Sequence, residues 1–192
     1  MKKILLSVGA ILAVSLAANA QDVQFGVKGG VNFANLPGSD VDNAKMKTGF
    51  HVGGFVEIPL SDQFSLQPEV LYSTQGQKGK ILGQDYTLSL DYVNVPILAK
   101  YYAVENLGIV LGPQIGFLAK SEAETGDVSL DAKDGFKSVD IGIAVGAEYQ
   151  LENGILFGAR YNFGLTKVAE EVGNVKPDGK NGVIQVSVGY RF

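Results

Sequence analysis

Apolar and polar residues alternate along most of this 192-residue chain, and this period of two constrains the fold more than any other feature. Between residues 24 and 33, every odd position is Phe, Val or Gly, while the even positions hold Gln, Gly, Lys and Asn. Residues 139–149 repeat the pattern with Val, Ile, Ala and Tyr against Asp, Gly, Ala and Glu. Successive side chains of a strand point to opposite faces, so these runs predict strands with one apolar face.

Eight such runs follow one another, at residues 24–33, 50–58, 64–72, 86–102, 107–120, 139–149, 155–165 and 183–192. The connections alternate between long (35–47, 75–85, 121–138, 166–181) and short (60–63, 103–106, 150–154). Tilted strands of about ten residues with this rhythm are typical of membrane barrels. We therefore expect an all-β fold, an eight-stranded antiparallel up-and-down transmembrane β-barrel over residues 21–192, with both ends on the side of the short connections.

The fourth run contains one irregularity. Leu88, Leu90 and Tyr92 fall in the opposite phase to the apolar residues between Val93 and Tyr101. We expect either a β-bulge or a strand that continues beyond the bilayer.

The first twenty residues differ from the rest of the chain. Lys2 and Lys3 precede an apolar stretch over residues 4–18, and Ala18 and Ala20 supply the small residues that a signal peptidase accepts. This pattern predicts a signal peptide at residues 1–20, with cleavage after Ala20. The alternative is an uncleaved anchor, but the stretch is shorter than the roughly 20 residues that a spanning helix needs.

The composition restricts the possible cellular location and the possible classes of partner. Without Lys2 and Lys3 the chain has 14 basic and 20 acidic residues, a net charge of −6 that argues against nucleic acid as a partner. No cysteine is present, so disulfides and thiolate metal sites are excluded.

After residue 20 no apolar run could cross a bilayer as a helix, and the other way for a chain to span lipid is a closed barrel. We expect a bacterial outer-membrane protein in contact with lipid, with aromatic residues near the strand ends as interfacial girdles. The alternative is a soluble β-sandwich or lipocalin-like barrel with a core on its apolar face.

Charged residues recur on the polar face of the predicted strands. Opposite charges in a low-dielectric interior should meet. We predict a lumen ion network of eight residues, Lys28, Glu57, Glu69, Lys100, Asp140, Glu148, Arg160 and Arg191. The alternative is a proton or ion pathway.

Catalytic, metal and cofactor sites are hard to build from this sequence. His51 is the only histidine, and the adjacent residues offer no serine nucleophile. The Gly-rich stretch at residues 26–30 does not lead from a strand into a helix, as a phosphate loop would. We predict no catalytic residue, no metal and no cofactor, and an interior hydrogen-bonding role for His51.

Several segments resemble the PorT-type outer-membrane β-barrel family. They are residues 65–73 (SLQPEVLYS), 92–101 (YVNVPILAKY), 112–116 (GPQIG), 159–165 (ARYNFGL) and 189–192 (GYRF). The resemblance implies the barrel architecture, and it implies that Pro68, Pro96 and Pro113 are accommodated within strands. Tyr190 and the final Phe192 resemble the C-terminal signal that the barrel-assembly machinery reads during insertion.

Three classes of function compete. A narrow barrel filled by side chains disfavours a channel for a small polar solute, and the lack of a nucleophile disfavours a lipid-modifying enzyme. The third class is a monomeric structural or interaction protein with a plugged lumen, which contacts an unknown envelope or extracellular partner through its long loops. The sequence favours this class.

Overall fold

The computed structural model describes residues 23–38, 44–81, 84–125, 128–170 and 178–192. The predicted signal peptide, with Ala18 and Ala20, lies outside the described residues and stays a prediction. The described elements are β1 (Gln24–Asn35), β2 (Lys45–Pro59), β3 (Phe64–Ile81), β4 (Gln84–Val104), β5 (Leu107–Thr125), β6 (Val128–Asp131), η1 (Lys133–Gly135), β7 (Val139–Gln150), β8 (Ile155–Lys167) and β9 (Lys180–Arg191).

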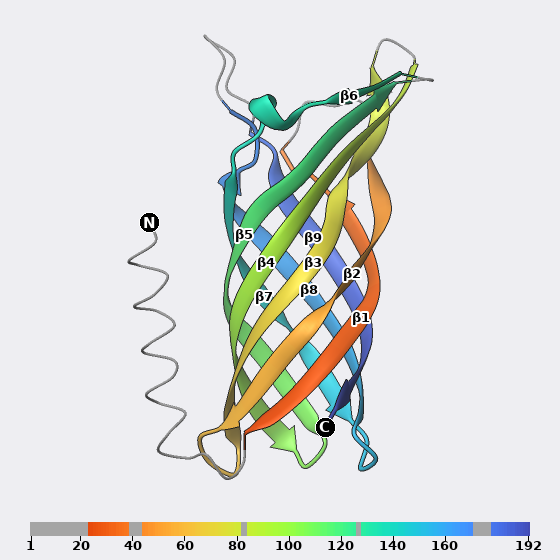
Figure 1. Cartoon of the computed structure of the whole chain (residues 1–192). Coiled ribbons are helices and arrows are strands. Elements are labelled where there is room, and N and C mark those ends of the chain that lie inside the picture. The colour runs from red at the N-terminus through yellow and green to blue at the C-terminus, as the bar shows by residue number, and fades with distance from the viewer. Residues whose placement is uncertain (1–22, 39–43, 82–83, 126–127, 171–177) are drawn as a thin grey trace.

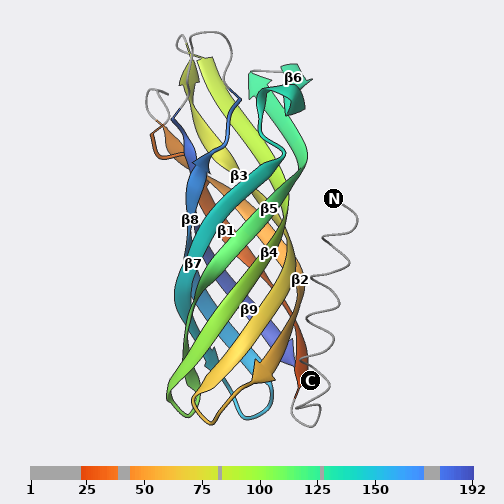
Figure 2. The ribbon, with the colours of Figure 1, turned by 90° about the vertical axis from the view of Figure 1, so that its left-hand side faces the viewer.

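Eight of these strands close into a ring (Figures 1 and 2). Each strand pairs antiparallel with its neighbour, β5 pairs with both β4 and β7, and β9 returns to β1. β6 lies outside the ring and pairs with β5. The short turns and the C-terminus lie at one end, and the hairpins with long connections lie at the other (Figure 1). The predicted eight-stranded antiparallel barrel is confirmed.

The wall of the barrel is apolar on its outside and polar on its inside. Phe25, Val27 and Val52 are each more than half exposed on the outer face, whereas Lys28 and Glu69 are almost fully buried. A soluble β-sandwich or lipocalin-like barrel would bury its apolar face, so this polarity excludes that alternative. No helix in the described part of the chain is long and apolar enough to span a bilayer.

The long connections contain more strand than the sequence pattern predicts. β3, β4 and β5 have 18, 21 and 19 residues, against 12 in β1. The interval 75–85 is therefore mainly paired strand rather than loop, and the interval 121–138 holds the end of β5, β6 and η1. The prediction of open loops was wrong here because a strand with water on its outer side needs no apolar outer face. Its ladder then continues without the alternation that marks a strand in lipid.

The phase irregularity of β4 has the same origin. β4 is paired along its length, and Leu88, Leu90 and Tyr92 lie on the same inner face as Lys100. β4 therefore continues past the apolar band, which is one of the two outcomes expected from the sequence. A register shift is also present, opposite Asp91 and Tyr92, where the extra residue lies on β5.

Pro68, Pro96 and Pro113 lie on the neighbouring strands β3, β4 and β5. Each proline interrupts the pairing on one edge of its strand and leaves the pairing on the other edge intact. Register pairs are missing beside Pro68 between β2 and β3, beside Pro96 between β3 and β4, and beside Pro113 between β4 and β5. On its opposite edge each proline stays in register, with Ile97, Gln114 and Ile143 respectively. This is the expected result for a residue without an N–H, and it shows how the barrel accommodates prolines in its wall.

Candidate functional site: the polar lumen

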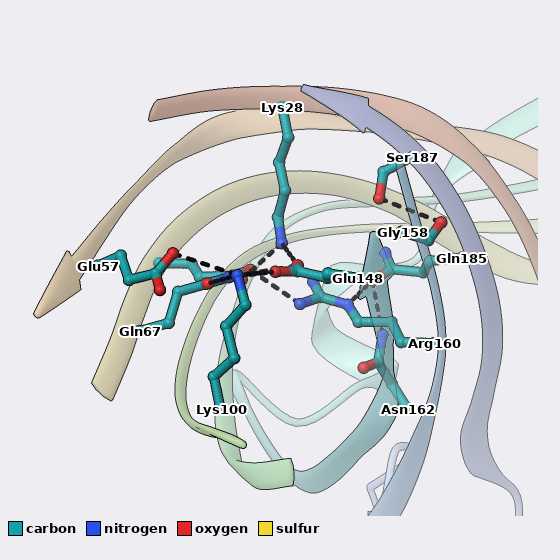
Figure 3. A network of polar contacts seen from close by, with 11 residues as sticks. Lys28, Glu57, Gln67, Lys100, Glu148, Gly158, Arg160, Asn162, Gln185 and Ser187 are labelled. Carbon is teal, nitrogen blue, oxygen red and sulfur yellow. Dashed lines mark hydrogen bonds and ion pairs between the residues drawn. The ribbon is translucent and has the colours of Figure 1, made fainter. Parts of the chain in front are cut away.

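Six long charged side chains meet in the half of the lumen near the short turns (Figure 3). Lys28, Lys100 and Arg160 provide three positive charges. Glu57, Glu69 and Glu148 provide three negative ones, and all six residues are at most 9% exposed. The charges therefore balance within the buried part of the network.

Glu69 contacts cations from two other strands. Lys28 Nζ lies 2.5 Å from its Oε1, and Arg160 NH1 lies 2.8 Å from its Oε2. These contacts connect β3 to β1 and β8, which places one carboxylate between two buried cations. Charge-assisted hydrogen bonds of this length are among the stronger polar contacts in proteins.

Glu148 of β7 holds the centre of the network. Its Oε1 lies 3.1 Å from Lys28 Nζ, and its Oε2 lies 3.2 Å from Lys100 Nζ. The Gln67 side chain donates to the carboxylates of both Glu69 (2.8 Å) and Glu148 (3.1 Å). Lys100 also reaches Glu57 Oε2 at 3.2 Å. With Arg160 of β8, side chains from six strands thus meet in the network.

A cavity of about 690 Å³ lies below the network, among the short turns. Glu57 lines it and accepts a hydrogen bond from the Tyr102 hydroxyl. Arg191 NH1 lies 3.7 Å from Glu57 Oε2 and is partly exposed. Glu57 therefore belongs both to the wall of the cavity and to the network.

Neutral side chains continue the packing beyond the charges. The Asn32 amide donates to Ser73 Oγ at 3.0 Å, and Asn32 Oδ1 contacts His51 Nδ1 at 2.8 Å. Gln185 donates to the same Asn32 oxygen and accepts from Arg160 Nε at 2.6 Å. His51 is 2% exposed and lies in this hydrogen-bonded layer.

Asp140 does not join the ion network, unlike the other seven residues predicted for it. It lies at the outer end of β7, where Thr166 Oγ1 donates to Oδ1 at 2.6 Å and Asn181 Nδ2 donates to Oδ2 at 2.8 Å. The network lies toward the other end of the lumen, where β7 contributes Glu148. Strand tilt separates inner-face residues of one strand along the barrel axis, and a list of inner residues does not show this separation.

A buried apolar cluster, which we call the apolar cap, lies at the outer end of the lumen, and the sequence analysis missed it. Its buried members are Leu36, Leu88, Leu90, Tyr92, Leu118 and Val168, with Tyr86 and Phe136 packed against them. Leu36, Phe136 and Val168 come from three different long connections. The available signal was the inward phase of Leu88, Leu90 and Tyr92, three successive apolar residues on the inner face of one strand.

Inner glycines leave room for these larger side chains. A Cβ at Gly108 would lie 2.6 Å from the Lys100 side chain, and one at Gly116 would lie 2.6 Å from Asn94. A Cβ at Gly146 would lie 2.4 Å from Arg160. The glycines therefore allow long polar residues to cross a narrow barrel.

A closed eight-stranded ring with an apolar exterior and a polar, filled interior defines an integral β-barrel protein of the bacterial outer membrane. The family model described as "Outer membrane protein beta-barrel domain" matches residues 19–170, and the chain belongs to this family. No curated protein matches the chain significantly.

Solved structures of outer-membrane barrels share the fold. Neisserial surface protein A (NspA) is 17% identical with a TM-score of 0.58, and Ail of Yersinia pestis is 15% identical with a TM-score of 0.54. Each match covers 90% of this chain and 100% of the other. OprG of Pseudomonas aeruginosa is 14% identical with a TM-score of 0.50, over 88% of this chain and 95% of the other. At these levels of sequence identity, the similarity shows a shared fold and nothing more.

Proposed function

We propose that this protein is a plugged, monomeric barrel whose role is to hold an extracellular platform for interaction with another molecule. The platform consists of the outer parts of β3, β4 and β5 (residues 74–81, 84–91 and 119–125), with β6 and η1. The observation that carries the proposal is the combination of an ion network and an apolar cap inside the lumen with strands that continue past the apolar band. A solute pathway would instead need a continuous opening through the lumen.

The platform extends well beyond the lipid-facing surface. On β3 the outward residues change from Val70 and Tyr72 to Lys78 and Lys80. Eight residues of strand cover about 26 Å along the strand direction. On β5 the outward apolar series ends at Phe117, and Glu122 and Glu124 follow. A rigid, polar extension on a barrel is suited to recognition at the cell surface.

A channel for a small polar solute is the second candidate. Among the described residues, the contacts of Lys28 with Glu69 and Glu148, and of Lys100 with Glu148, cross the lumen, which supports a plugged barrel over a channel. The apolar cap adds a second barrier. The closed lumen therefore favours interaction over conduction.

A lipid-modifying enzyme is the least favoured candidate. His51 and Ser73 both contact Asn32, but they are 2% and 0% exposed and lie behind the barrel wall. A nucleophile and its base must reach the substrate. This geometry supports a non-enzymatic role.

The resemblance to PorT-type barrels and the assembly signal at Tyr190 and Phe192 belong to the same proposal. The family match concerns the broader outer-membrane barrel domain. Within it we propose outer-membrane lipid and, during insertion, the barrel-assembly machinery as partners. At the platform we propose an envelope or extracellular molecule.

Shortening the platform tests the proposal. In one set of variants, residues 76–89 or 121–137 are replaced by a tight Gly-containing turn, and in another Glu69→Gln alters the lumen. Cells that display each variant are compared for binding to a panel that begins with sucrose octasulfate, the heparin analogue that was crystallised with Ail. We expect surface binding to disappear with the platform and to survive the lumen change. Binding that survives every platform deletion but is lost in a folded Glu69→Gln protein would place the function in the lumen.

A further inference from the structure

Three lysines gather on the outward face at the outer ends of β2 and β3. Lys45 and Lys78 are direct partners in the register of these two strands, and both are exposed. Lys47 of β2 is half-buried, its Nζ donates to the Gln75 carbonyl at 3.3 Å, and it lies within electrostatic reach of Lys78. We call Lys45, Lys47 and Lys78 the lysine patch.

The charge of the lysine patch is not balanced by the residues around it. Like charges at directly opposite positions of a sheet are destabilising. No carboxylate among the described residues forms an ion pair with any of the three lysines. Asp91 and Glu124 lie within electrostatic reach of Lys47, but the Asp91 carboxylate accepts a hydrogen bond from the Tyr72 hydroxyl at 2.7 Å.

Charged residues elsewhere on the rims of the barrel are arranged differently. Lys120 Nζ lies 2.8 Å from Glu122 Oε1, and Lys167 forms an ion pair with Asp178. The three short turns at the opposite end each carry one acidic residue and no basic one. The lysine patch is therefore a local excess of positive charge on a chain whose net charge is −4, and an anionic ligand would offset it.

The strand geometry gives the depth of the patch in the membrane. The exposed rings of Phe50 on β2 and Tyr72 on β3 contact each other and mark the outer border of the apolar band. Lys47 and Lys45 follow three and five residues further out, which is about 10 and 17 Å of strand, or roughly 7 and 12 Å of height at a tilt near 45°. The headgroup layer is about 5–7 Å thick on each side of a bilayer. The patch therefore extends from the headgroup layer to just beyond it.

We propose that the lysine patch binds the phosphate groups of a phosphorylated glycolipid in the outer leaflet. Lysine ammonium groups form charge-assisted hydrogen bonds with phosphate oxygens, and basic clusters next to a membrane recognise lipid headgroups. A phosphorylated sugar headgroup reaches further from the hydrocarbon than the phosphate of an ordinary phospholipid, as the patch does. The exposed side chains of Phe50, Val52 and Tyr72 below the patch offer an apolar surface to the acyl chains of the same lipid. The proposal does not depend on the partner of the platform, because it concerns a lipid on the outer wall.

Lipid-dependent stabilisation tests the proposal. Purified, folded protein in a zwitterionic detergent is heated with lipid A that carries two phosphates or with chemically dephosphorylated lipid A, and the midpoint is followed by heat-modifiable gel mobility. Because a ligand of the folded state stabilises it, we expect phosphorylated lipid A to raise the wild-type midpoint by several degrees. Lys45→Gln combined with Lys78→Gln should remove most of that rise. Lys120→Gln combined with Lys167→Gln removes the same charge from lysines that have carboxylate partners, and it should keep the rise.

Two further measurements separate a lost ligand from a damaged fold. Without lipid A, the Lys45→Gln and Lys78→Gln protein should be at least as stable as the wild type, because it lacks two like charges at facing positions. Native mass spectrometry of the wild type, which needs no variant, should find phosphorylated lipid A bound and much less of the dephosphorylated form.

Four outcomes would overturn the proposal. The first is a wild-type midpoint that phosphorylated lipid A does not raise, and the second is an equal rise with dephosphorylated lipid A. The third is an equal rise in the wild type and in the folded Lys45→Gln and Lys78→Gln protein. An equal rise with inorganic phosphate or sucrose octasulfate in place of the lipid would assign the patch to a soluble anion instead.

Discussion

At the scale of single residues, the lumen depends on matched charges more than on any one contact. Glu148 separates two lysine ammonium groups at 3.1 and 3.2 Å, so it neutralises charges that would otherwise repel each other in a dry interior. Removing one member of a buried ion pair leaves an uncompensated charge.

We therefore expect Glu148→Gln to lower the free energy of unfolding by about 3–5 kcal/mol. Equilibrium urea unfolding in lipid vesicles measures the change. Glu152→Gln is the matched control, because Glu152 is exposed on the turn between β7 and β8 and should change stability by less than about 0.5 kcal/mol. Adding Lys100→Met to Glu148→Gln restores the balance of charge and should recover part of the loss. A loss for Glu148→Gln no larger than that of the control would contradict the account.

The last residue has a separate role in the proposal. Phe192 is 74% exposed, and its ring lies 5.3 Å from that of Tyr190. An exposed side chain contributes little to packing, so its loss should change assembly more than stability.

We expect Phe192→Ala to reduce the amount of barrel assembled in cell outer membranes and to leave unaided refolding in detergent almost unchanged. Heat-modifiable mobility measures both. Phe157→Ala, which removes a half-exposed phenylalanine from the outer wall, should reduce neither. Equal defects of Phe192→Ala in cells and in detergent would show a structural role instead of a recognition signal.

At the scale of elements, contact with lipid determines which strands can be predicted from the sequence. The ring strands were predictable because hydrocarbon requires an apolar residue at every second position, as in β1 and β7. The outer parts of β3, β4 and β5 were not, because water on their outer side removes that requirement. The inward apolar phase of Leu88, Leu90 and Tyr92 was visible in the sequence, but the other members of the cap and the separate position of Asp140 were not. They depend on strand tilt and on which inner side chains meet across the lumen, and a single sequence does not give that register.

The cap is an element of its own and should open without loss of the barrel. Leu90 is fully buried in it, and a carboxylate there would have no opposite charge among the other cap residues. We expect Leu90→Asp to expose the connection between β5 and β7 to proteolysis while the barrel stays folded. Limited proteolysis of intact cells measures this, with Leu130→Asp on the exposed part of β6 as control. Wild-type resistance in Leu90→Asp would show that the cap does not hold that connection.

At the scale of the whole molecule, the central claim is that an outer-membrane barrel of this width is closed. We propose that the ion network blocks it near the short turns and that the apolar cap blocks it at the outer end. Eight strands enclose a space that side chains can fill, which supports this proposal.

Single-channel recording in planar bilayers tests this claim most directly. Wild-type protein should insert without measurable conductance. A variant that combines Leu90→Ser, Lys100→Ala and Arg160→Ala, and so removes bulk at both levels, is the comparison that shows what an opened lumen conducts. Reproducible conductance steps from the purified wild-type barrel would contradict the account and favour a channel for a small polar solute.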